Sequence, residues 1–247
     1  MDNQQLNYQT FNVLCKKSED TLNDINSILS SYHDKISTSN FLTALDSAIK
    51  IFDICKENQC IITVKIGANE ILEILNSQNQ TEDLFNLFLK NDENYLNEVI
   101  TNSKSFNLLE PKLSHYNDAV TAYRNKAYYS AGAALFTIVD FLLSTITNNP
   151  TTATKKRFTP LEDHLKDNEH FCMFVCTAFL TINTFFEDTS FSKDHEPNVL
   201  NRHWFLHGRY TKNITQYDCI KLFCLIHALL KAGMLYKSAQ NNATNNT

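Results

Sequence analysis

Turn-forming residues are scarce in this chain, whose 247 residues include four glycines and four prolines. Folds rich in β-strands need glycine and proline at their many tight turns, so this scarcity favours long helices joined by few turns. Hydrophobic residues make up 43% of the sequence, which is enough to fill a packed core. We therefore expect an all-α protein.

Apolar residues recur at helical spacing along most of the chain. Residues 61–64 also suit a strand, but the apolar positions that follow them favour a helix. Segments 82–90 and 93–101 start at the good capping residues Thr81 and Asn91, which separates them into two short helices. Before Pro111 the expected helices cover residues 21–31, 40–56, 61–76, 82–90 and 93–101.

Pro111 is the expected boundary between two parts of the chain. Residues 1–111 are predicted to be an acidic helical N-terminal region, and residues 112–239 a C-terminal bundle of four or five helices. The tail 240–247 is almost entirely Asn, Gln, Thr and Ala, which predicts disorder. Residues 115–127 and 128–147 are expected to form two helices or one long kinked helix. The other expected helices of the second part cover residues 169–186, 199–207 and 216–236.

Charge is distributed unevenly between these two parts. The formal net charge of −5 does not suggest a nucleic-acid-binding protein by itself. Residues 1–111 carry 8 basic and 16 acidic side chains, whereas residues 112–247 carry 14 basic and 11 acidic side chains. The second part is therefore mildly basic, which permits contact with RNA.

Cysteine usage and the first residues predict a cytoplasmic protein. The seven cysteines are odd in number and form no CxxC pair, which is typical of reduced, buried thiols. Residues 1–20 are polar and unlike a signal peptide. The most apolar stretch, residues 131–146, is interrupted by Asp140, so we expect no membrane-spanning segment.

The segment 201–208 reads Asn-Arg-His-Trp-Phe-Leu-His-Gly and carries the clearest chemical signal. Arginine is well shaped to bind phosphate with two parallel hydrogen bonds, and histidine exchanges protons near neutral pH. Together they suggest phosphodiester chemistry. Five residues of helix turn roughly 500°, so Arg202 and His207 would point about 140° apart. A second copy across a two-fold axis would bring the complementary halves together.

A metal site is the chemical alternative. His203 and His207 stand at i and i+4, on nearly the same helical face, which is half of a familiar zinc arrangement. A third ligand would come from the preceding loop, at His195, Glu187 or Asp188. The chain has no HExxH sequence and no ordered Cys/His framework, so we expect no metal.

A purely structural role is the other alternative. Arg202 could pair with Glu196 or Asp194 at the surface, and His207 could be favoured at a helix end by the helix dipole. Asp140 is either a buried partner of Arg202 or Arg124, or a helix residue that faces water. Core anchoring is a commoner role than base stacking for the three residues Trp204, Phe205 and Leu206.

Arg202-His203-x-x-x-His207 resembles the signature of the HEPN superfamily, an arginine and a polar residue followed by a histidine four to six positions after the arginine. The upstream apolar helix 128–147, with the single acidic residue Asp140, is similar to a helix of that family, and the last long helix occupies the expected place. The resemblance covers roughly residues 112–240.

The resemblance implies a helical bundle that dimerises and acts as a metal-independent endoribonuclease with no cofactor. Arg202 and His207 would be the active pair and His203 a polar auxiliary, in a composite site shared by two protomers. Such domains occur in bacterial phage defence, abortive infection and toxin–antitoxin systems, where an antitoxin or sensor is a further partner. The alternative is a non-catalytic HEPN module that binds RNA or protein.

One subgroup of the family, partnered with nucleotidyltransferase antitoxins, carries a tyrosine two residues after the histidine. Here that position is Arg209, and the tyrosine follows at Tyr210, so the sequence departs from the subgroup pattern. We expect RNA contacts from the motif's neighbours and from a basic run in the polar connection 148–159. The predicted RNA-binding residues are Lys155, Lys156, Arg157, Asn201, Arg209 and Tyr210.

Overall fold

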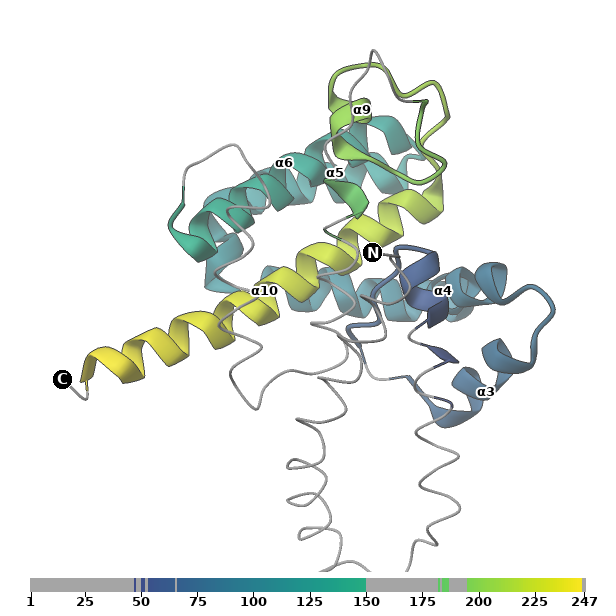
Figure 1. The fold of residues 1–247 in the computed structure, drawn as a ribbon, viewed down its shortest axis with the longest axis horizontal. Coiled ribbons are helices and arrows are strands. Elements are labelled where there is room, and N and C mark those ends of the chain that lie inside the picture. Colours follow the sequence, from purple (N-terminus) through teal and green to yellow (C-terminus); the bar gives the residue numbers. More distant parts are fainter. Residues whose placement is uncertain are drawn as a thin grey trace, which may run out of the picture. The chain divides into compact units, whose positions relative to one another are not determined.

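The computed structural model describes residues 47, 50–51, 53–64, 66–149, 182, 184–186 and 195–245. Of the described residues, 75% are helical and none lies in a β-strand, which confirms the all-α prediction for this part of the chain. Residues 47–247 form one compact unit, and the described helices all belong to it (Figure 1).

Four of the five helices predicted after Pro111 lie close to their expected positions, and the fifth, 169–186, lies almost entirely outside the described residues. The helix α10 continues to Asn245, beyond its expected end at residue 236, because each added residue of an established helix gains one backbone hydrogen bond. The disordered tail 240–247 stays a prediction. The described elements are α3 (Ala68–Asn76), α4 (Gln80–Lys104), the 3-10 helix η1 (Asn107–Lys112), α5 (Leu113–Arg124), α6 (Tyr128–Thr147), α9 (Arg202–Leu206) and α10 (Gln216–Asn245).

The helix α4 is broken in its middle, as the two short predicted helices require. Lys90 is extended, and Asn91, Asp92 and Glu93 follow with φ of 52°, 57° and 58°. Asparagine and aspartate tolerate this left-handed conformation better than other side chains do. Glu93 is held in place by an ion pair with Arg124 of α5.

The segment before α3 contains a tight turn followed by an extended stretch. Residues 53–57 are helical, and the turn closes through a hydrogen bond from Cys60 N to the Cys55 carbonyl (2.9 Å). Gln59 lies in this turn with φ of 53°. Residues 61–63 have no regular structure, so neither the expected helix from 61 nor the strand alternative forms there, and α3 begins at Ala68.

The apolar helix α10 is the centre of the core. It packs against α6 on one side and α4 on another, and in Figure 1 it passes between the α5–α6 pair and α4. A Cβ atom added at Gly233 would lie 2.7 Å from Ile146 and 2.9 Å from Leu108, so the close approach of α10 to α6 and η1 depends on glycine.

Helices from both sides of Pro111 share this core. The ring of Phe85 in α4 stacks on that of Tyr217 in α10, with centroids 4.6 Å apart and an interplanar angle of 11°. Pro111 itself lies inside η1. The division of the chain into residues 1–111 and 112–239 stays a prediction, but the described packing crosses that position.

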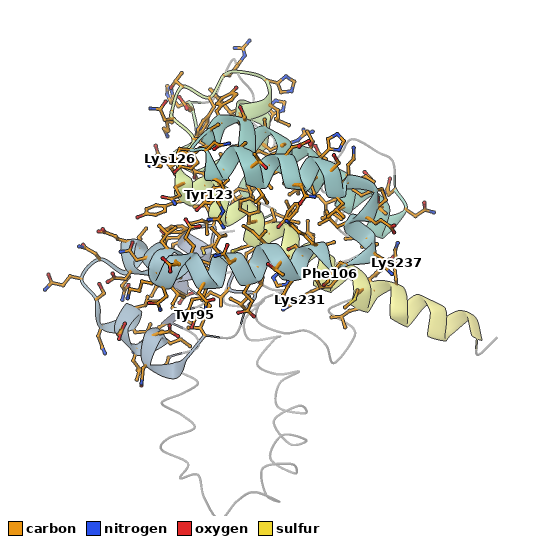
Figure 2. All side chains as sticks on the ribbon, turned by 180° about the vertical axis from the view of Figure 1, so that it is seen from behind. Tyr95, Phe106, Tyr123, Lys126, Lys231 and Lys237 are labelled. Atoms are coloured by element: carbon orange, nitrogen blue, oxygen red, sulfur yellow. The ribbon has the colours of Figure 1, made fainter. Side chains whose placement is uncertain are left out.

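A polar cluster is buried where α10 meets the extended stretch. His227 Nδ1 lies 2.8 Å from Thr63 Oγ1, and Lys231 Nζ donates to the Thr63 carbonyl at 2.6 Å. His227 is fully buried and contacts the edge of the Phe106 ring; Figure 2 shows Phe106 and Lys231 close to each other beside α10. Burial, and secondarily the charge of Lys231, lowers the pKa of His227 to about 4.

Two described helices are long and apolar enough to cross a membrane, judged by length and composition alone. They are α6 and the Gln216–Lys237 part of α10, each with mean hydropathy 1.6. In α10, 78% of the apolar window is buried inside the unit, and in α6 half of it is. Core helices of a helical bundle pass the same test, so the expectation of no membrane contact stays a prediction.

Candidate functional site

The candidate site is carried by α9, a five-residue helix whose two ends are fixed by local hydrogen bonds. At its start, Trp204 N donates to the side-chain oxygen of the N-cap residue Asn201 (3.2 Å). At its end, Gly208 adopts φ of 67°, and Arg209 N donates to the Trp204 carbonyl (2.9 Å). Gly208 thus ends the helix in the left-handed conformation predicted for it.

The side chain of Phe205 anchors α9 on α6. Phe205 is 1% exposed and lies with its ring centroid 4.7 Å from Tyr129 and 5.7 Å from Phe136. Trp204 is also buried. These two residues are core anchors, as expected, and therefore do not form a base-stacking platform. Leu206 differs from the expectation, because it lies on the outer face of this short helix and is exposed.

Arg202 is held by Asp140 of α6. Its Nε and Nη2 atoms donate to the same carboxylate oxygen, at 3.0 and 2.5 Å. The two side chains are 28% and 20% exposed, so the pair lies at the edge of the core. Of the alternatives left open by the sequence, the structure selects Asp140 as the partner of Arg202; Arg124 pairs with Glu93 instead.

Glu196, one of the two expected surface partners of Arg202, binds a different segment. Glu196 accepts hydrogen bonds from the backbone N–H groups of Thr211 (2.9 Å) and Lys212 (3.3 Å) and from the Thr211 hydroxyl. These bonds lower the pKa of the Glu196 carboxyl. Glu196 thus fastens the loop that follows α9, and Asp194 lies outside the described residues.

The two histidines of the motif lie together. The ring centroids of His203 and His207 are 4.6 Å apart with an interplanar angle of 65°. His203 lies in the first turn of α9 and His207 is its C-cap; His207 is exposed and His203 is half-buried, so both reach the surface. Two adjacent imidazoles are a pair of groups that can accept and donate protons in phosphodiester chemistry.

Nothing in the described part of the chain completes a metal site around these histidines. Among the described residues, no group of three or more His, Cys, Asp or Glu side chains is placed to hold a metal ion. His195 is described and exposed. Glu187 and Asp188, the other two candidate ligands, lie outside the described residues.

The predicted RNA-binding residues fall into three groups. Arg209 is exposed, and Tyr210 is half-buried with its ring edge against Phe205 (6.4 Å). Burial raises the pKa of Tyr210 to about 12, with smaller contributions from Asp218 and Glu196. Asn201 is 1% exposed and acts as the helix cap, and its expected RNA contact stays a prediction. The run Lys155, Lys156 and Arg157 lies outside the described residues.

One residue that contacts this region was missed by sequence reasoning. Gln59 Nε2 donates to the Leu200 carbonyl (3.2 Å), directly before the cap of α9. The contact joins positions 141 residues apart, and no local pattern marks it. Asn201, in contrast, had a local signal as a cap, because an asparagine preceding a short apolar helix is a common N-cap.

Comparison with protein-family models, curated proteins and solved structures finds no match to this chain. The resemblance to the HEPN superfamily therefore depends on the motif and on the order of the helices.

Proposed function

We propose that this protein is a metal-independent endoribonuclease of the HEPN type. The single observation that carries the proposal is the arrangement on α9: Arg202, held by Asp140, shares one short helix with the adjacent rings of His203 and His207. An effector role in bacterial phage defence, abortive infection or a toxin–antitoxin system is part of the proposal, as is a cytoplasmic location.

The ion pair leaves the guanidinium able to bind phosphate. Arginine has five N–H donors, and two of its nitrogens here donate to Asp140. The remaining donors are available to the non-bridging oxygens of a phosphodiester. Asp140 also restricts the rotamers of Arg202, so less conformational entropy is lost when a phosphate binds.

The reaction is cleavage by the neighbouring 2′-hydroxyl. A neutral imidazole removes the 2′-OH proton as the oxygen attacks phosphorus, the bond from phosphorus to the 5′-oxygen breaks, and an imidazolium protonates that leaving oxygen. Arg202 stabilises the charge on the phosphorane. The products are a 2′,3′-cyclic phosphate and a free 5′-hydroxyl.

The base and the acid come from the motif histidines. His207 takes one of these roles, and the other falls to His203 or to His207 of a second copy. A homodimer with a composite site supplies the second copy, because a two-fold interface brings identical patches together.

The test is cleavage of cellular RNA by the purified protein in the presence of EDTA. We expect wild type to cleave RNA but not DNA of the same sequence, since DNA lacks the 2′-OH. His207→Ala and Arg202→Ala should each lower the rate roughly 10²-fold or more. Product ends that resist phosphatase until acid treatment would identify the cyclic phosphate.

The matched control for the histidine is His115→Ala on α5, since His115 is exposed and lies outside the motif. Its activity should equal that of wild type. Cleavage that persists in both motif variants would refute the assignment. Activity that EDTA abolishes would favour a metal-dependent reaction.

A non-catalytic module that binds RNA or protein is the second candidate. The Arg202–Asp140 ion pair favours it, because the carboxylate reduces the charge stabilisation that the guanidinium offers a phosphorane, while the remaining N–H donors still bind phosphate. This candidate predicts RNA binding without turnover, and binding that is equal for wild type and His207→Ala. Growth on induction separates the two: toxicity relieved by His207→Ala supports the enzyme.

A further inference from the structure

Gln59 is a buried polar residue whose side chain reaches the chain just before α9. Its Nε2 donates hydrogen bonds to the Leu200 carbonyl (3.2 Å) and to Thr184 Oγ1 (2.8 Å). Gln59 and Leu200 are each 1% exposed. Because water does not reach this carbonyl, losing the amide that binds it is costly.

The backbone around Gln59 presents this side chain from a fixed turn. Gln59 has φ of 53°, a conformation that is costly for any residue with a Cβ atom. Two backbone hydrogen bonds close the turn, from Gln59 N to the Lys56 carbonyl (3.3 Å) and from Cys60 N to the Cys55 carbonyl (2.9 Å). Such a conformation persists where the surrounding contacts determine it.

Two polar contacts hold the start of α9, and they come from separate parts of the sequence. Leu200 precedes the cap residue Asn201, which precedes Arg202. Asp140 of α6 holds the Arg202 side chain, and Gln59 holds the backbone two residues before it. A shift of the Leu200 carbonyl would therefore rotate the start of α9 and move Arg202 relative to Asp140.

We infer that Gln59 is a positioning residue for the motif formed by Arg202, His203 and His207, acting through the Leu200 carbonyl. The effect on cleavage rests on the proposed function; the effect on α9 does not. It follows that residues 53–60, which precede the region of family resemblance, help to position the motif and are needed for a functional site.

The variant Gln59→Met tests this inference. Methionine has a similar length and shape and the same unbranched Cβ, but it has no N–H donor. The matched control is Gln80→Met, which removes a similar amide-to-carbonyl hydrogen bond, from Gln80 Nε2 to Leu75 (3.1 Å), at the start of α4. Gln59→Asn is the second variant, because asparagine tolerates the left-handed conformation but is one methylene shorter.

Two readouts report on α9 directly in the full chain. Amide hydrogen exchange over residues 201–208, measured by mass spectrometry, should be about fivefold faster in Gln59→Met than in wild type. Acrylamide quenching of Trp204, the chain's sole tryptophan, should increase. In Gln80→Met both should match wild type. Wild-type rates of exchange and quenching in Gln59→Met would overturn the inference. If Gln59→Met does not fold, the same two measurements on Gln59→Asn test it instead.

RNA cleavage adds the functional readout. A positioning role predicts that kcat falls about tenfold with KM unchanged, because the phosphate still binds but the reacting groups are misaligned. If wild type cleaves no RNA, the proposed function fails while exchange and quenching still test Gln59. If wild type cleaves RNA and Gln59→Met cleaves it equally fast, the positioning role is wrong.

Discussion

Removing the charge at Asp140 should destabilise the protein through Arg202. Two hydrogen bonds, at 3.0 and 2.5 Å, join the pair, and its side chains are 20% and 28% exposed. Exposed ion pairs contribute about 0.2–1 kcal/mol, whereas breaking a buried pair costs about 3–5 kcal/mol. Because this pair is neither fully exposed nor fully buried, we expect Asp140→Asn to lower the free energy of unfolding by about 2 kcal/mol.

That loss converts into a measurable change of melting temperature. Unfolding entropy is about 2.1 cal/mol/K per residue, so a unit of roughly 200 residues loses about 2–4 °C per kcal/mol. We expect the Tm of Asp140→Asn, measured by circular dichroism during thermal unfolding, to be about 4–8 °C lower than that of wild type. Asp118→Asn, an exposed acid on α5, is the control and should change the free energy of unfolding by less than about 0.5 kcal/mol.

A double-mutant cycle isolates the pair from other effects. Arg202→Gln, Asp140→Asn and the double variant are compared by urea unfolding, and the coupling energy should be about 1–1.5 kcal/mol. A coupling energy below about 0.3 kcal/mol, with additive single effects, would show that the two side chains do not support each other and would refute the reasoning.

Three further predictions concern other parts of the unit. The free energy of unfolding should fall as the pH drops from 6.5 to about 4, because unfolded His227 binds a proton in this range and folded His227, with its pKa of about 4, does not. The largest change in the free energy of unfolding from this group is about 3 kcal/mol, and His227→Gln should remove it, which flattens the pH dependence. Gly233→Ala should destabilise by about 1–3 kcal/mol in urea unfolding, although alanine is the better helix former, because its Cβ would lie 2.7 Å from Ile146. Asn201→Ala should cost about 1–2 kcal/mol and make Trp204 easier to quench, because the α9 cap is lost.

Helix positions were largely predictable because their signals are local. The periodicity of apolar residues placed α5 and α6 within a few residues of their observed bounds. Gly208 marked the end of α9, and its φ of 67° explains why. The end of α10 lies beyond its expected position at residue 236, because composition says little about how far a formed helix propagates.

The candidate site was predictable only in part. The motif residues share one short helix, so their order along the chain already placed His203 beside His207. The partner of Arg202 was a choice among several acids, and packing of α9 against α6 selected Asp140, 62 residues away. The anchoring of Phe205 beside Gly132 of α6 brings the two helices together at that point.

The sequence by itself determined that this protein is helical, where most of its described helices lie, and which helix carries arginine and two histidines. Those properties depend on residues three to five positions apart, which composition and spacing encode directly. The tertiary structure alone decided that Arg202 is held by Asp140 and that Gln59 binds the Leu200 carbonyl. Such contacts depend on how helices pack in three dimensions, and burial then makes each unsatisfied polar group costly enough to select one partner.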